Sequence, residues 1–186
     1  KDSIKIVKEN PYRLATDIYG IGFKTADKIA QNLGFEKNSL IRAEAGVLYI
    51  LGELSSEGHT FIYRDELIKK TTEELLIDSD LIIKSVFQLI ARDKIYAESI
   101  KNDPAIYLKS LYISEQNSAI KLKKLINTPQ FKIEIDIPKA IDWIQEKEQI
   151  TLTNMQKEAV SKAISGKVIT ITGGPGTGKT TIIKCI

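Results

Sequence analysis

Apolar residues in the first 34 positions recur at helical spacing in short segments separated by glycines. Residues 1–9 allow a short helix, and Asn10-Pro11 has the composition of a second helix start, with an N-cap asparagine and a proline at the first helical position. The apolar residues of 23–33 lie on one helical face, and Gly34 ends that helix. Because Tyr19-Gly20-Ile21-Gly22 separates the two helices, the pattern predicts a helix-hairpin-helix.

Between residues 40 and 108 the pattern changes from helical to extended. Helical spacing predicts three helices, at 40–55, 65–76 and 78–90. Phe61-Ile62-Tyr63 is a short extended segment, and 95–98 and 105–108 flank the polar turn Lys101-Asn102-Asp103-Pro104, which is a hairpin signal. This order predicts a winged-helix-like region. A wing can contact DNA, but many such domains only bind protein or pack, so both interpretations stay open.

A glycine-rich turn follows the apolar, β-branched run Val168 to Thr172, which predicts a strand. Gly173, Gly178, Lys179 and Thr180 fill the fixed positions of G-x-x-x-x-G-K-[ST], the P-loop or Walker A motif. Glycines let backbone N–H groups approach phosphate oxygens, the lysine adds a cation for the β- and γ-phosphates, and the threonine hydroxyl can bind Mg²⁺. The alternative is a strand-to-helix turn without a ligand.

Gln156 allows two interpretations. It stands three residues after Thr153, a predicted N-cap, as in a capping box. Its amide also offers the donor and acceptor that match the edge of adenine, and it lies just upstream of the predicted P-loop strand. The residues expected to bind the nucleotide are Gln156, Gly174, Pro175, Gly176, Thr177, Gly178, Lys179, Thr180 and Thr181, with Lys179 also catalytic and Thr180 also the metal ligand.

The glycine hairpin has the chemistry of a DNA-backbone contact. Its glycines allow a tight turn whose N–H groups face outward at a helix N-terminus, Ile21 can fill the core between the helices, and Lys24 is placed where a DNA phosphate would lie. We therefore expect DNA contacts from Gly20, Ile21, Gly22, Lys24 and Thr25. The alternative is a hairpin that serves packing alone.

Two further helices, at 110–126 and 138–146, flank a segment in which Phe131, Ile133, Ile135 and Ile137 alternate with polar residues, as in a strand or an extended linker. We expect a helix-hairpin-helix at 1–38, a winged-helix-like accessory region with a connecting helix at 39–128, and the start of a P-loop motor domain at 129–186. The predicted fold class is mainly α, with these accessory parts followed by a truncated α/β motor domain.

Composition narrows the class only a little. The net charge of +3 is too small to prove a nucleic-acid partner, although residues 101–132 hold six lysines against two acidic residues, a stripe that can bind phosphate or simply be solvated. A single cysteine, Cys185, excludes an intrachain disulfide and fits a reducing cytoplasm. No apolar run approaches a membrane span and no signal peptide is visible, and the missing initial Met suggests a fragment.

Taken together, these segments resemble one family. Leu152-Thr153-Asn154-Met155-Gln156 and the run from Ile171 to Thr181 resemble the Q motif and motif I of superfamily 1 DNA helicases. Asn10-Pro11-Tyr12 and Gly20-Ile21-Gly22-Phe23 resemble the helix-hairpin-helix of bacterial RecD-like helicases. The accessory region of that family is also resembled by Gly58-His59-Thr60 and by residues 111–115.

The resemblance implies an ATP-dependent helicase that uses ATP and Mg²⁺, moves 5′→3′ on single-stranded DNA and acts in cytoplasmic DNA repair. It implies that Gln156 holds adenine. The DNA partner of such a helicase would be single-stranded DNA or a single-strand/duplex junction, and no membrane is expected as a partner. The acidic Walker B pair, arginine finger and second motor domain of the family do not occur before Ile186, so we expect the isolated chain to be inactive.

Two alternatives to the helicase interpretation remain open. The chain is a DNA-binding module only, or it comes from a non-helicase P-loop ATPase with a DNA-binding prefix. We also expect self-association through the run Val168 to Thr172, since an unpaired apolar strand invites pairing with another copy.

Overall fold

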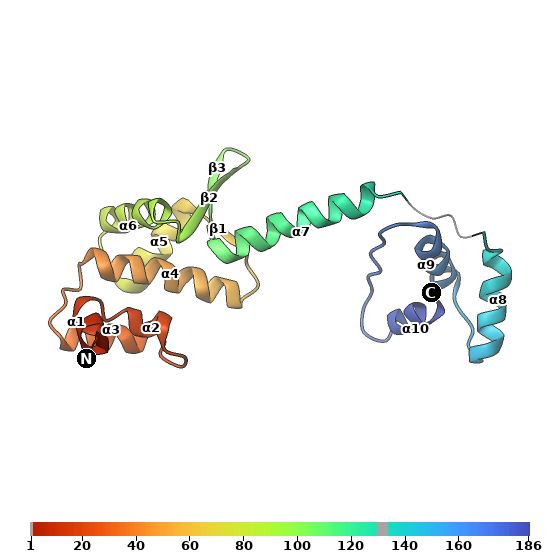
Figure 1. The fold of residues 1–186 in the computed structure, drawn as a ribbon, viewed down its shortest axis with the longest axis horizontal. Helices are drawn as coiled ribbons and strands as arrows, with labels where there is room; N and C mark the ends of the chain where they lie inside the picture. Colours follow the sequence, from red (N-terminus) through yellow and green to blue (C-terminus); the bar gives the residue numbers. More distant parts are fainter. Residues whose placement is uncertain (1, 130–133) are drawn as a thin grey trace. The chain divides into compact units, whose positions relative to one another are not determined.

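The computed structural model describes residues 2–129 and 134–186, which divide into two compact units, 1–116 and 117–186 (Figure 1). Most of the described residues are helical, and the strands form one small sheet. The first unit contains the helices α1 (Asp2–Glu9), α2 (Arg13–Asp17), α3 (Phe23–Asn32), α4 (Leu40–Ser56), α5 (Arg64–Leu75) and α6 (Ser79–Ala91). None of the helices in the described residues has both the length and the apolar character of a bilayer span.

The predicted helix-hairpin-helix is present as α2, a glycine turn and α3. In the turn before α2, Asn10 Oδ1 accepts a hydrogen bond from the Tyr12 N–H at 3.1 Å, whereas the N-cap residue is Tyr12 and not the predicted Asn10. Gly20 has φ +89°, a backbone conformation that costs glycine little and other residues more. Ile21 is half-buried and packs against the core, as expected for a residue that fills the space between the two helices.

The next elements follow the predicted winged-helix-like order. After α4 come β1 (Phe61–Tyr63), α5, α6, β2 (Ile95–Ile100) and β3 (Asp103–Leu108), and the antiparallel sheet has the order β1-β3-β2. The register places Ile106 of β3 opposite both Ile62 and Ala97. Lys101 and Asn102 both have positive φ, which is the geometry of a type I′ hairpin turn. The predicted hairpin is therefore confirmed.

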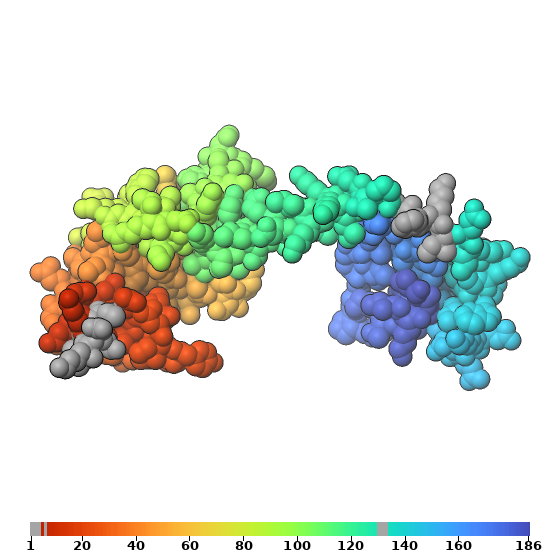
Figure 2. Space-filling model, viewed as in Figure 1, coloured from red at the N-terminus to blue at the C-terminus, as the bar shows by residue number. Residues whose placement is uncertain are grey.

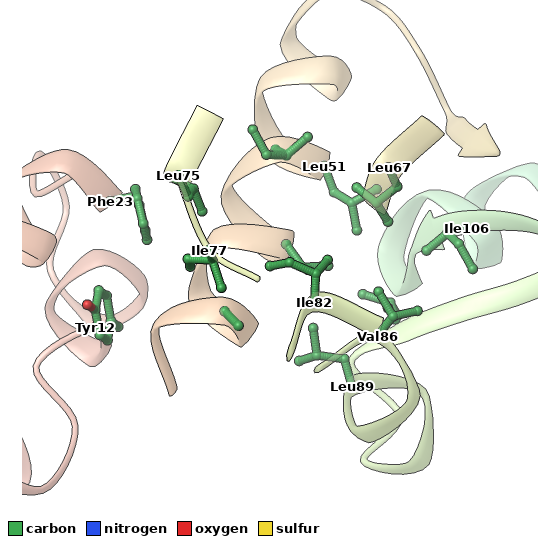
Figure 3. Packing of buried hydrophobic residues seen from close by; sticks show 14 of the residues in the cluster. Tyr12, Phe23, Leu51, Leu67, Leu75, Ile77, Ile82, Val86, Leu89 and Ile106 are labelled. Carbon is green, nitrogen blue, oxygen red and sulfur yellow. The ribbon is translucent and has the colours of Figure 1, made fainter. Parts of the chain in front are cut away.

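One hydrophobic core joins the hairpin to the winged-helix-like region. Tyr12 and Phe23 from the hairpin, Leu51 from α4, Ile82 from α6 and Ile106 from β3 belong to a single buried cluster (Figure 3). In Figure 2 the N-terminal helices, in red, lie directly against the following helix, in orange. The first unit is therefore continuous across residue 38, and the residue numbers of the predicted domain boundaries stay predictions.

Close packing of α4 against α5 depends on a glycine. A Cβ on Gly46 would come within 2.0 Å of Leu75 Cδ1, so a larger residue would force the two helices or the leucine to move. Gly52, on the same helix, has no heavy atom within 4 Å of the corresponding position. The two glycines of α4 therefore have different roles, and only Gly46 is required by contact.

The second unit contains most of α7 (Lys109–Asn127), together with α8 (Ile137–Glu148), α9 (Asn154–Ser165) and α10 (Lys179–Cys185). Among the described residues, its buried cluster consists of Ile141, Leu152, Val160 and Ile182. Of the alternation predicted over 131–137, Phe131 and Ile133 lie outside the described residues, whereas Ile137 begins α8.

The strand predicted at Val168 to Thr172 is wrong for this chain. These residues carry no strand assignment, and Val168 and Ile169 are 40% and 38% exposed. A strand needs a hydrogen-bonded neighbour, and the paired strands of the described residues all lie in the sheet of the first unit. The β-branched sequence of this segment is therefore insufficient to form a strand by itself.

Candidate nucleotide and DNA sites

The P-loop backbone is shaped by two glycines. Gly176 and Gly178 have φ values of +75° and +80°, and α10 begins directly afterwards at Lys179. Such left-handed residues let consecutive N–H groups turn toward one side of a loop. The loop therefore has the backbone form required of a phosphate cradle, even though the preceding segment is not a strand.

Lys179 is folded over this loop. Its Nζ donates hydrogen bonds to the carbonyl oxygens of Gly173 and Gly174, both at 2.7 Å. The Thr177 hydroxyl donates to the Gly174 carbonyl at 2.9 Å, which ties the loop together. The ammonium is thus held in the concave part of the loop by neutral carbonyls, which phosphate oxygens can replace without breaking an ion pair.

Gln156 connects α9 to the P-loop, a link that sequence reasoning missed. Its Oε1 accepts from the Thr153 N–H at 2.9 Å and the Thr153 hydroxyl accepts from the Gln156 N–H at 3.3 Å, so the predicted capping box is present. Its Nε2 donates to the Thr177 carbonyl at 3.2 Å. A Cβ on Gly178 would lie 2.5 Å from this Nε2, so the contact also requires glycine there.

The predicted nucleotide residues are close together. Residues 174–181 form the loop and the first turn of α10, and Gln156 contacts the loop from α9. The Thr180 side chain is exposed in that first turn, where its hydroxyl can serve as one oxygen ligand of Mg²⁺ beside phosphate oxygens. Left-handed glycines, an ammonium and a hydroxyl therefore fit a magnesium-bound polyphosphate.

The hairpin presents its amides at the start of α3. Gly22 is the N-cap residue, and its carbonyl accepts from the N–H groups of Thr25 and Ala26, both at 3.1 Å. Helix geometry leaves the first N–H groups of α3, at Phe23 and Lys24, without intrahelical acceptors. Gly20, Gly22 and Thr25 are exposed, so the turn can receive a phosphate.

Lys24 has neighbours that sequence reasoning did not predict. Its side chain is 74% exposed, but Nζ lies 3.9 Å from Glu74 Oε1 and 5.8 Å from the centre of the Tyr49 ring. A hydrogen bond and electrostatic attraction to Tyr49, and to a smaller extent electrostatic attraction to Glu74, raise the pKa of the Lys24 ammonium. The lysine is therefore charged and accessible, and its ammonium also lies near side chains of α4 and α5.

A buried ionic cluster fixes the hairpin to α4. Arg42 donates through Nε to Asp27 Oδ1 at 2.8 Å and through NH2 to Asp27 Oδ2 at 3.0 Å. The Tyr12 hydroxyl donates to Oδ1 at 2.7 Å, and Gln31 Nε2 donates to Oδ2 at 3.0 Å. Burial would raise the pKa of Asp27, but these hydrogen bonds outweigh it and hold that pKa below the ordinary range of an aspartate. No local motif marks this cluster, because Tyr12 and Arg42 each lie 15 positions from Asp27.

Comparisons with known proteins agree with this geometry. Residues 1–61 match the family model described as the ATP-dependent RecD2 DNA helicase HHH domain, and residues 156–186 match an AAA domain. The ATP-dependent RecD2 DNA helicase of Deinococcus radiodurans is 26% identical over 182 residues, which cover 92% of this chain and 25% of that protein. The resemblance to RecD-like helicases is confirmed. The chain spans about a quarter of the length of that relative.

The two matched segments coincide with the two sites. The hairpin from Gly20 to Thr25 lies within the first match, and Gln156 and the P-loop lie within the second. Helicase-family origin, nucleotide use and DNA binding therefore have support from two separate segments of the chain. The roles of individual residues remain proposals.

Proposed function

We propose that this chain is part of an ATP-dependent DNA helicase, in which the hairpin binds DNA and the P-loop binds ATP with Mg²⁺. The whole protein would couple ATP hydrolysis to 5′→3′ translocation on single-stranded DNA and to duplex unwinding. The observation that carries the proposal is that a RecD2-type hairpin and a Walker loop holding Lys179 occur in one chain. Neither feature alone indicates a helicase, since P-loops occur in many ATPases.

In this proposal the residues of the loop bind and orient the nucleotide. Backbone N–H groups of Gly174 and of residues 176–178 hold phosphate oxygens, and Lys179 exchanges its contacts to Gly173 and Gly174 for the β- and γ-phosphates. Thr180 supplies a hydroxyl ligand, and Mg²⁺ when bound neutralises phosphate charge. Gln156 keeps the loop attached to α9 through Thr177, and to read adenine its amide would exchange its contacts to Thr153 and Thr177 for the edge of the base.

The test is nucleotide binding by this chain, measured by calorimetry with magnesium and a non-hydrolysable ATP analogue. Lys179→Ala should weaken binding at least about tenfold, since a charge-assisted contact contributes about 1.5–3 kcal/mol. Lys184→Ala is the matched control, because Lys184 lies on the same helix in its last turn. Equal affinities of the two variants would contradict the role of Lys179. In the whole protein, the same substitution should abolish unwinding of duplexes with a 5′ single-stranded tail.

A second candidate is DNA binding without nucleotide use. It is favoured by the larger continuous core of the first unit and by the lack of a strand before the P-loop. It predicts salt-dependent binding of single-stranded DNA that weakens in Gly20→Ala/Gly22→Ala, together with no measurable affinity for the ATP analogue. Binding of the analogue would reject this candidate.

Self-association through Val168 to Thr172 remains part of the proposal. The segment is apolar and partly exposed, so a second copy can supply the pairing that it lacks. Sedimentation should then give a mass that rises with concentration, and Ile169→Lys should suppress the rise. A monomer at every concentration would contradict this expectation.

A further inference from the structure

Tyr19 stands at the tip of the hairpin with its whole side chain in solvent. Its relative exposure is 105%, the largest among the exposed apolar and aromatic side chains of the described residues. Figures 1 and 2 show the loop between α2 and α3 projecting from the surrounding helices. An aromatic ring placed entirely in water adds nothing to the folded state, because it buries no apolar surface.

Three of the four other exposed aromatic residues in the described part of the chain have ring or cation partners, and the fourth is Phe87. Tyr96 stacks on Tyr112 with ring centres 4.0 Å apart, and Lys147 lies 4.7 Å from the centre of the Trp143 ring. Tyr63 lies edge-on to Phe61, with ring centres 5.5 Å apart. Those side chains have structural roles that explain their positions, and packing offers no such explanation for Tyr19.

The surroundings of Tyr19 are open and lie next to the proposed phosphate contacts. A Cβ built on Gly20 or Gly22 would have no heavy atom within 4 Å apart from those of the adjacent residues, so no other part of the chain covers these glycines. Gly20, with φ +89°, lies in the turn that leads from Tyr19 to Gly22, the N-cap residue of α3. The negative charge of Asp17 is compensated by Arg13, whose NH2 lies 2.7 Å from its Oδ2.

We propose that Tyr19 stacks on a nucleobase of unpaired DNA whose neighbouring phosphate is held by the hairpin amides. This inference rests on the DNA-binding role proposed for the hairpin, and adds the side chain that holds an unpaired base. Base faces inside a duplex are covered by the adjacent pairs, so a ring reaches a base face only on a single strand or at a terminal pair. Stacking also tolerates any sequence, because every base has a π-face.

The experiment measures binding of three fluorescent probes by the full 186-residue chain at one salt concentration. The probes are a single-stranded oligothymidylate, an abasic strand with the same number of phosphates, and a closed dumbbell duplex without a terminal pair. Tyr19→Ala should bind oligothymidylate about 5- to 150-fold more weakly, the range expected for one lost stack, and should bind the other two probes as the unaltered chain does. Tyr19→Phe and Tyr19→Trp should retain binding, since both keep an aromatic ring.

Phe87→Ala is the matched control, because Phe87 is a 59% exposed aromatic residue on α6 in the same unit and should not affect binding. In a Trp143→Phe background, Tyr19→Trp provides a direct signal: its fluorescence should be quenched by oligothymidylate and not by the abasic strand. Both tryptophan substitutions are at exposed positions, so neither should disturb the core.

Several outcomes would overturn the proposal. Equal weakening of Tyr19→Ala on oligothymidylate and on the abasic strand would place the contact on the backbone. Unchanged binding by Tyr19→Ala, together with weakened binding by Gly20→Ala/Gly22→Ala, would remove the stacking contact and keep the DNA role of the hairpin. If the unaltered chain binds none of the probes, the DNA role and the stacking contact are both wrong.

Discussion

Replacing Arg42 with alanine should greatly lower the free energy of unfolding of the first unit. The Arg42 and Asp27 side chains are only 8% and 12% exposed, and Arg42 also donates through NH1 to the carbonyls of Lys37 at 3.1 Å and Leu75 at 2.9 Å. The substitution leaves a buried carboxylate and two carbonyls without their cationic donor. Asp27 would keep only the neutral donors Tyr12 and Gln31.

The expected loss is about 3–5 kcal/mol, the usual cost of removing one partner of a buried ion pair. Since a domain is stable by only about 5–15 kcal/mol, this is a large part of the total. Arg13→Ala is the matched control in the same hairpin: its pair with Asp17 has an N–O distance of 2.7 Å, but the side chains are 50% and 47% exposed. That pair should contribute only about 0–1 kcal/mol.

Hydrogen exchange of amides in α3 and α4 measures this loss, because it reports on the first unit separately from the second. A double-mutant cycle with Asp27→Ala should give a coupling of about 2–3 kcal/mol, since each single variant leaves a buried group unpaired. If Arg42→Ala lowers the free energy of unfolding by no more than Arg13→Ala does, the buried cluster does not hold the hairpin in place and the reasoning fails.

The same cluster predicts how stability changes with acid. Burial favours the neutral carboxyl, but the donors around Asp27 hold its folded-state pKa below the value of an unfolded aspartate. The unfolded state therefore takes up the proton first, so this contribution is fully present above the unfolded pKa of about 3.9 and is lost as pH falls through the folded pKa. Asp27→Asn should be less stable at neutral pH and should show a shallower loss of stability below about pH 4.

Three further substitutions test the glycine contacts. Gly46→Ala should destabilise the first unit by about 1–3 kcal/mol, because its Cβ meets Leu75 at 2.0 Å. Gly52→Ala should be neutral or stabilising by up to about 1 kcal/mol. Chemical denaturation measures both changes, and a larger loss of stability in Gly52→Ala than in Gly46→Ala would contradict the packing argument. Gly178→Ala should weaken binding of the ATP analogue at least about tenfold, because φ is +80° and the new methyl group meets Gln156, and calorimetry showing unchanged affinity would count against the loop geometry.

Local sequence signals predicted much of the fold. The glycines of the hairpin, the capping box of Thr153 and Gln156, and the start of α10 at the Walker lysine all depend on residues within a few positions of each other, and each is present. The type I′ turn at Lys101 and Asn102 belongs to the same class. Short-range patterns predict such features because the backbone geometry of a turn or cap is set by the residues that form it.

Long-range partnerships were not predictable from the pattern. Asp27 lies in a polar stretch of α3 and Arg42 in an apolar stretch of α4, and their pairing depends on how two helices pack. The contact from Gln156 to the Thr177 carbonyl crosses 21 positions and has the same origin. In both cases the sequence indicates a polar residue and its hydrogen-bonding capacity, while the partner depends on tertiary structure.

The segment Val168 to Thr172 shows why the phosphate loop and the strand before it have different requirements. The loop forms its bonds internally: Lys179 and Thr177 donate to carbonyls of the loop, and Gln156 donates to it from the adjacent helix. A strand in a P-loop domain instead depends on parallel neighbours, which cover both its edges and faces. The loop geometry proposed for nucleotide binding can therefore form without a paired strand before it. This separation supports testing ATP binding in this chain and unwinding in the whole protein.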